Sequence, residues 1–194
     1  MQVKDLKYYS DLDFDEYLQI SGYSFSGIKM LEAGQPITPS EGMLLGTRVH
    51  NYLLEPHKYD GADSFKVYTI ATELKKWLGD AWKYLEPELA FTARFEHNGM
   101  YLDYKGRTDL IYKGKIIIDL KVLSARVKVC VDRFGYDKQL SGYALATGCP
   151  TATILAYNKA LKPNKINQQY VEHFNVAISH DWWNYMIVKY GKPI

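Results

Sequence analysis

The stretch from Gly106 to Lys121 constrains the fold more than any other part of the sequence. It holds two apolar segments separated by Lys113-Gly114, and glycine accepts the positive φ that a tight turn requires. The second segment, Lys115 to Ile118, is rich in β-branched residues, as in a buried strand. This order predicts two antiparallel strands joined by a short turn.

The second of these strands ends in charged residues. Side chains alternate along a strand, so Asp119 and Lys121 project from one face and Leu120 from the other. Asp109, on the preceding strand, can bring a second carboxylate to the same place. Oxygen ligands of this kind suit hard cations such as Mg²⁺, which keep several waters. The pattern therefore predicts a divalent metal site with a lysine beside it.

Gly106-Arg107-Thr108-Asp109 followed by Asp119-Leu120-Lys121 resembles the core of the PD-(D/E)xK nuclease superfamily. In particular it resembles the RecB-like and RecE-like phage exonucleases of the exonuclease VIII type. It implies an α/β fold with a restriction-endonuclease-like core, in which helices flank a mixed central β-sheet. It also implies that Mg²⁺ or Mn²⁺ binds Asp109 and Asp119, and that both aspartates and Lys121 are catalytic.

Two further segments fit this resemblance. The sequence around Gly46 and His50, followed by Leu53-Leu54-Glu55-Pro56, is similar to a RecE-like segment whose histidine lies near or on the metal. Glu88, at the start of the first predicted strand, matches a catalytic acidic residue of the family. Two alternatives remain open: His50 could be a helix histidine bonded to backbone, and Glu88 a surface residue at a strand end.

The resemblance also suggests residues that contact DNA. Gln139 and Tyr143 are one helical turn apart and resemble the Gln-x-x-x-Tyr motif of RecB-like nucleases, which implies that they orient the site and bind DNA. Arg107, Lys105 and Lys138 flank the site and could bind backbone phosphates. The alternatives are a polar helix face with Tyr143 in the core, and a solvated face of positive charge.

The pattern of the remaining sequence predicts alternating helices and strands. From Glu88, a three-stranded antiparallel meander turns at Asn98-Gly99 and again at Lys113-Gly114. Ser24 and Ser40 are expected to cap helices. The predicted helices span residues 25–32, 41–54, 71–85, 133–146 and 181–189, and two further strands span 151–157 and 170–178.

Length and composition bound the interpretation. A chain of 194 residues predicts one nuclease domain over residues 1–194, with 1–23 as an N-terminal extension. The net charge of only +2 means that DNA binding must come from a local basic patch. Cys130 and Cys149 match no zinc or disulfide spacing, no apolar run approaches a membrane span, and no signal-peptide pattern is seen, so a cytoplasmic location is expected.

The resemblance implies a metal-dependent exonuclease that cleaves duplex DNA ends to 5′-phosphate products, in recombination or repair by a phage or mobile element. The resemblance also implies a single-strand annealing partner and a homo-oligomeric ring, with the aromatic-rich chain ends as candidate interfaces. Two alternatives remain: a RecB-like endonuclease, defence or repair nuclease of the same fold, and an inactive DNA-binding module. The intact Asp109, Asp119 and Lys121 argue against the inactive module.

Overall fold

The computed structural model describes residues 1–10, 12–36, 38–161 and 170–194. In chain order, with η marking 3₁₀ helices, its elements are β1 (Gln2–Tyr9), α1 (Phe14–Gln19), α2 (Phe25–Ala33), α3 (Glu41–Leu54), η1 (Pro56–Lys58), α4 (Ser64–Leu78), η2 (Gly79–Tyr84), β2 (Leu85–Pro87), β3 (Ala90–His97), β4 (Met100–Arg107), β5 (Leu110–Tyr112), β6 (Ile116–Leu123), α5 (Val127–Phe134), α6 (Tyr136–Thr147), β7 (Thr151–Asn158), β8 (Val171–Val176), α7 (Asp181–Tyr190) and β9 (Lys192–Pro193).

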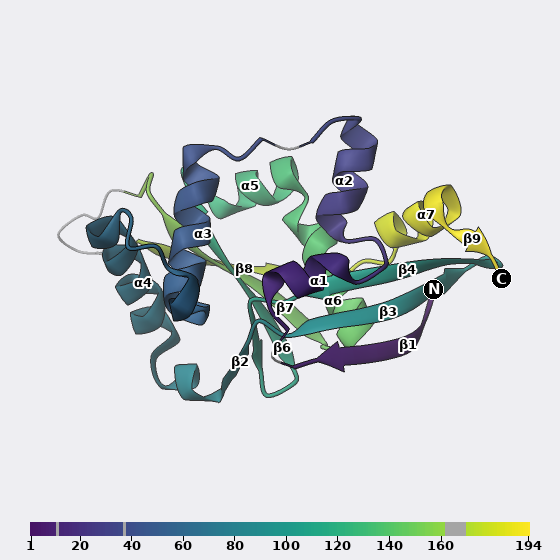
Figure 1. Ribbon diagram of the computed structural model, residues 1–194, viewed down its shortest axis with the longest axis horizontal. Coiled ribbons are helices and arrows are strands. Elements are labelled where there is room, and N and C mark those ends of the chain that lie inside the picture. Colours follow the sequence, from purple (N-terminus) through teal and green to yellow (C-terminus); the bar gives the residue numbers. More distant parts are fainter. Residues whose placement is uncertain (11, 37, 162–169) are drawn as a thin grey trace.

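The strands form two sheets flanked by helices (Figure 1). One sheet is antiparallel, with the order β1-β3-β4-β9, and the other is mixed, with the order β2-β5-β6-β7-β8. In the mixed sheet β6 and β7 are parallel, and α5 and α6 supply the crossover that a parallel pair needs. The predicted α/β fold with a mixed sheet between helices is confirmed. None of the helices in the described ranges has both the length and the apolar character needed to cross a bilayer.

The antiparallel sheet is built on the hairpin of β3 and β4. Asn98 and Gly99 have φ of 51° and 72°, which is the positive-φ pair that a type I′ turn requires, so the predicted hairpin is confirmed. β1, from the segment expected as an extension, pairs with β3 along its length. β9 pairs with β4 at Met100 and Tyr101, and both chain termini lie at this end of the molecule (Figure 1).

The predicted strand from Met100 to Tyr112 is divided between the two sheets, with Thr108 and Asp109 at the transition. Glu88 and Leu89 make the matching transition between β2 and β3. The two crossings are hydrogen-bonded to each other, because Glu88 N donates to Asp109 O at 2.9 Å and Thr108 N to Leu89 O at 3.0 Å. The meander therefore continues from one sheet into the other, and two carboxylates lie at the junction.

Both faces of β6 are covered, in agreement with the predicted alternation. Ile117 and Leu123 pack into a cluster with residues of α5, α6 and α7. Ile118 and Leu120 pack into a second cluster with residues of α3 and α4. The core thus lies on both sides of β6. Asp119 and Lys121 are therefore carried by a well-packed strand.

The helices that begin at a predicted serine cap are located best. Gly27 N donates to Ser24 Oγ at 3.1 Å and Met43 N to Ser40 Oγ at 3.3 Å, which confirms both predicted caps. α4 begins at Ser64, earlier than predicted. The predicted helix over 133–146 is two helices, α5 and α6, since Gly135 between them has φ of 69° and a left-handed residue ends α5.

Candidate metal centre

Three side chains from separate elements meet where the two sheets join. His50 comes from α3, Glu88 from the link between β2 and β3, and Asp109 from the link between β4 and β5. Each offers one ligand atom, and the three atoms lie within 4.8 Å of one another. Two carboxylates and an imidazole form a donor set that Mg²⁺ or Mn²⁺ accepts. Of the residues predicted from sequence, these three are brought together as a group.

His50 and Asp109 are both anchored to the backbone of β6. Leu120 N donates to Asp109 Oδ2 at 2.7 Å, and His50 Nε2 lies 2.9 Å from Leu120 O and 3.5 Å from Asp109 Oδ2. A carbonyl only accepts, so Nε2 is the donor in this contact. In the metal-free structure His50 is therefore a helix histidine bonded to backbone, which is the alternative given above. Coordination of a metal through Nε2 would replace this hydrogen bond.

Asp119 and Lys121 lie beside this group. Asp119 is almost fully buried, and Lys121 Nζ lies 2.6 Å from its Oδ2. The two atoms are close but not aligned as a hydrogen bond, so Oδ2 is a buried oxygen without a hydrogen-bond partner. Asp119 was predicted as a metal ligand, yet it lies outside the three-residue group, in which Glu88 takes its place. Its metal-binding role stays a prediction.

The carboxylates of the site carry more negative charge than the nearby cations offset. Burial raises the pKa of Glu88 to about 7, with a further rise from Asp109, although Arg107 and His50 oppose it. Burial also raises the pKa of Asp119. Burial lowers the pKa of Lys121, but the carboxylates of Asp119 and Asp109 outweigh that effect and raise it. Clustered, partly uncompensated carboxylates fit a divalent cation.

These shifts predict how the metal-free protein responds to pH. The pKa of Glu88 rises from a usual 4.5 to about 7, so the folded protein binds more protons than the unfolded chain between those values. Stability in EDTA should therefore fall as pH rises from about 5 to about 8. Thermal unfolding of wild type and Glu88→Gln, with and without Mn²⁺, checks this. The variant should show a flatter profile and Mn²⁺ should stabilise wild type most at pH 8; identical pH profiles for the two proteins would contradict it.

Two of the predicted phosphate-binding cations, Lys105 and Arg107, contact other protein groups in the structure. Lys105 is buried, and its Nζ donates to the carbonyls of Tyr17, Leu18 and Ile20 at 3.3, 2.9 and 2.7 Å. In this structure the ammonium of Lys105 is therefore occupied by backbone carbonyls at the C-terminal end of α1, and the structure gives no support to its predicted phosphate contact. Arg107 is also largely buried and bridges two glutamates. Only Lys138 of the three predicted cations is exposed.

Gln139 and Tyr143 pair as the motif predicts, since Gln139 Nε2 donates to Tyr143 Oη at 3.0 Å. Tyr143 itself is buried and packs against the Phe91 ring, with the ring centroids 5.8 Å apart. A Cβ at Gly106 would lie 2.4 Å from the Phe91 ring and 2.8 Å from the Tyr143 ring, so a glycine is needed for this packing. The alternative with Tyr143 in the core is the one observed, and it leaves partly exposed Gln139 as the member that can reach a ligand.

Sequence reasoning assigned no role to Glu55 and Tyr136, which also border the site. Glu55 receives Arg107 Nη2 at 2.7 Å, and Lys121 Nζ lies 5.1 Å from the centre of the Tyr136 ring. Glu55 belongs to the Leu53-Leu54-Glu55-Pro56 segment of the family resemblance, and that segment is a usable signal. Nothing in the sequence around Tyr136 marks it, because its contact depends on how α6 packs over β6.

A group of side chains that could hold a metal ion thus lies at the junction of the two sheets, beside the buried Asp119–Lys121 pair. No protein-family model matches the sequence, and neither does any curated protein. One solved structure, of a protein from Eubacterium rectale named as an exonuclease, is similar to this chain. The two are 21% identical with a TM-score of 0.50, and the match covers 91% of this chain and 73% of that chain. This likeness confirms the predicted resemblance at the level of the fold.

Two other solved structures are similar over much of the chain. A phage-related exonuclease from Haemophilus somnus 129PT is 13% identical, with a TM-score of 0.44 over 82% of this chain and 72% of that chain. An alkaline exonuclease from Laribacter hongkongensis is 14% identical, with a TM-score of 0.40 over 84% of this chain and 71% of that chain.

Proposed function

We propose that this chain is a metal-dependent DNA exonuclease that degrades duplex ends to 5′-phosphate products, in recombination or repair by a phage or mobile element. The observation that carries the proposal is the convergence of His50, Glu88 and Asp109, with ligand atoms within 4.8 Å, beside the Asp119–Lys121 pair. The fold shared with a protein named as an exonuclease supports the same reaction class.

The roles of the side chains follow from their positions. Glu88 and Asp109 would hold Mg²⁺ or Mn²⁺, with His50 and Asp119 at the edge of the same site. When bound, such a cation offsets charge on the scissile phosphate and makes a water more acidic. Lys121 stays protonated between two carboxylates and opposes the negative charge that builds on the phosphate oxygens. Asp119 holds the ammonium of Lys121 in place.

A comparison of linear and covalently closed duplex DNA tests the proposal. With Mg²⁺ or Mn²⁺, end-labelled linear duplex should be degraded to 5′-phosphate nucleotides, the closed circle should survive, and excess EDTA should stop the reaction. Cleavage of the circle would favour the endonuclease of the same fold. Binding of DNA without cleavage under all metal conditions would favour the inactive binding module.

The ring, the annealing partner and the cytoplasmic location stay predictions.

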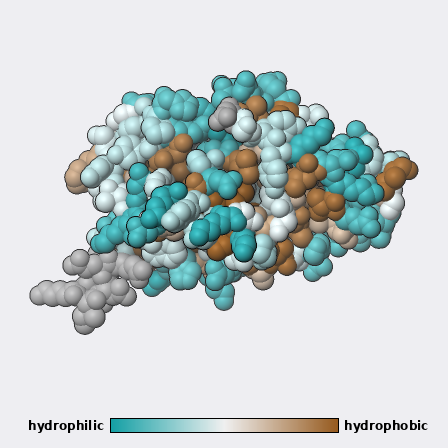
Figure 2. Space-filling model, turned by 90° about the horizontal axis from the view of Figure 1, so that it is seen from below, coloured by the Kyte–Doolittle hydropathy of each residue, from teal (hydrophilic) through white to brown (hydrophobic). Residues whose placement is uncertain are grey.

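On the face drawn in Figure 2, hydrophobic and hydrophilic residues are interspersed. Of the aromatic chain ends suggested as ring interfaces, Trp183 is fully buried and unavailable, whereas Tyr8, Phe14 and Tyr185 are exposed. Light scattering at micromolar protein, alone and with DNA and Ca²⁺, tests the ring, and a monomer in both samples would rule it out.

A further inference from the structure

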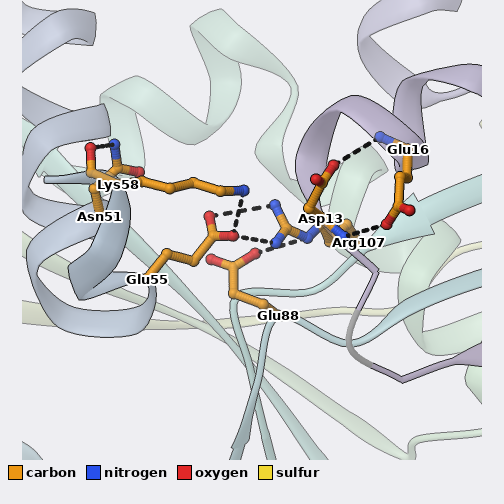
Figure 3. Close-up of polar contacts among 7 residues, drawn as sticks. All are labelled: Asp13, Glu16, Asn51, Glu55, Lys58, Glu88 and Arg107. Atoms are coloured by element: carbon orange, nitrogen blue, oxygen red, sulfur yellow. Dashed lines mark hydrogen bonds and ion pairs between the residues drawn. The ribbon is translucent and has the colours of Figure 1, made fainter.

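Arg107 divides its guanidinium between two carboxylates that come from different parts of the fold. Its Nη2 lies 2.7 Å from Oε1 of Glu55, at the C-terminal end of α3. Its Nε lies 3.1 Å from Oε2 of Glu88, at the junction of the sheets. Figure 3 shows the arginine between the two glutamates. The Nε contact is close without hydrogen-bond alignment, whereas the Glu55 contact is a hydrogen bond.

This arrangement is enclosed and further braced. The side chains of Arg107, Glu55 and Glu88 are 11%, 13% and 15% exposed. Lys58 Nζ reaches the same Glu55 oxygen at 2.7 Å, so Glu55 is held from two sides (Figure 3). The ring of Phe14, from α1, lies 5.7 Å from the guanidinium carbon. The two cations and two glutamates therefore interact in a largely enclosed space, where ion pairs are screened less than at the surface.

The backbone of Glu88 is also constrained. Its φ of 53° is left-handed, which is costly for a residue other than glycine and is maintained only when the surroundings fix it. The hydrogen bond from Glu88 N to Asp109 O provides such a constraint. With the backbone fixed and Oε2 turned to Arg107, Glu88 forms an ion pair with no other Lys or Arg among the described residues.

We propose that Glu55 and Arg107 are positioning residues for the metal ligand Glu88, an inference that rests on the proposed function. Arg107 holds Oε2 of Glu88 and leaves Oε1 to the cation. Glu55 retains the outer nitrogens of the guanidinium, so that Arg107 does not close on both oxygens of Glu88. Without Glu55, the planar fork of Arg107 would form the bidentate carboxylate pair that it favours. The arginine would then compete with the metal for Glu88.

The test measures Mn²⁺ binding by calorimetry on the full chain without DNA. Glu55→Gln keeps the shape of the side chain but removes its charge, and should weaken Mn²⁺ affinity about 10- to 100-fold, as expected for a residue that orients a ligand. Arg107→Lys keeps the charge but cannot bridge two carboxylates, and should weaken affinity similarly. At saturating Mn²⁺, Glu55→Gln should recover kcat to within a few-fold, because the metal is then in place.

Glu172→Gln is the matched control. Glu172, on β8, has a similarly exposed side chain, at 16%, and also pairs with an arginine, Arg126, but is not one of the three grouped residues. It should bind Mn²⁺ as wild type does. A folded Glu55→Gln with wild-type affinity would overturn the inference, as would a wild type that binds no Mn²⁺; if Glu55→Gln does not fold, Arg107→Lys decides in the same way. A wild type that binds Mn²⁺ but cleaves no DNA refutes the proposed function alone, and the affinity comparison still decides the inference.

Discussion

Asp109→Asn should abolish DNA cleavage and lower Mn²⁺ affinity at least about 100-fold, more than the loss of an orienting residue. Asp109 contributes one of the two carboxylates in the three-residue group, so the substitution halves the negative charge offered there. The asparagine oxygen can still accept from Leu120 N, as Asp109 Oδ2 does at 2.7 Å. The fold should therefore survive, and calorimetry with Mn²⁺ together with degradation of linear duplex measures both losses.

Asp103→Asn is the control for this substitution. Asp103 lies on β4, the strand that leads to Asp109, and it pairs with Arg94 at 3.0 Å while 47% exposed. Removing this exposed charge should leave Mn²⁺ binding and cleavage unchanged, because exposed ion pairs contribute little. The assignment of Asp109 fails if a folded Asp109→Asn binds Mn²⁺ within about threefold of wild type and still degrades DNA.

The parts of the site that the sequence predicts are those with local signals. The strand ending in Asp119 and Lys121 is marked by its β-branched run and by the alternation of side chains. The helix of His50 is marked by the cap at Ser40. These signals depend on neighbours within a few residues. The resemblance supplied what they could not, namely that Glu88, Asp109 and His50 belong to one place.

The parts that sequence reasoning misplaced depend on contacts between distant segments. A lysine is usually exposed, but Lys105 of β4 is buried beside α1 and donates to three backbone carbonyls there. Arg107 forms a hydrogen bond with Glu55, which lies 52 positions earlier in the sequence. Burial and long-range pairing are set by tertiary packing, which no periodicity encodes. A charged residue next to a motif is therefore weak support for a phosphate contact.

The split of the predicted strand from Met100 to Tyr112 has the same origin. The alternating pattern continues through Thr108 and Asp109; Gly106 predicts a bend nearby, but no local feature indicates that the chain passes into a second sheet. The break arises because β4 pairs with β3 in one sheet and β5 pairs with β2 and β6 in the other. The transition places Asp109 at the junction rather than inside a ladder, which frees its side chain for the candidate metal site.

Lys121→Met should lower kcat about 10²- to 10³-fold while Mn²⁺ affinity stays the same or increases. In the proposed mechanism the ammonium of Lys121 opposes the charge on the phosphate, and removing one such group typically has this effect. Affinity should not fall, because the substitution releases Asp119 from its partner at 2.6 Å. Single-turnover cleavage at saturating Mn²⁺ and calorimetry measure the two quantities. Lys115→Met, an exposed lysine just before the same strand, should behave as wild type. A folded Lys121→Met with a wild-type rate would show that Lys121 has no part in the chemistry.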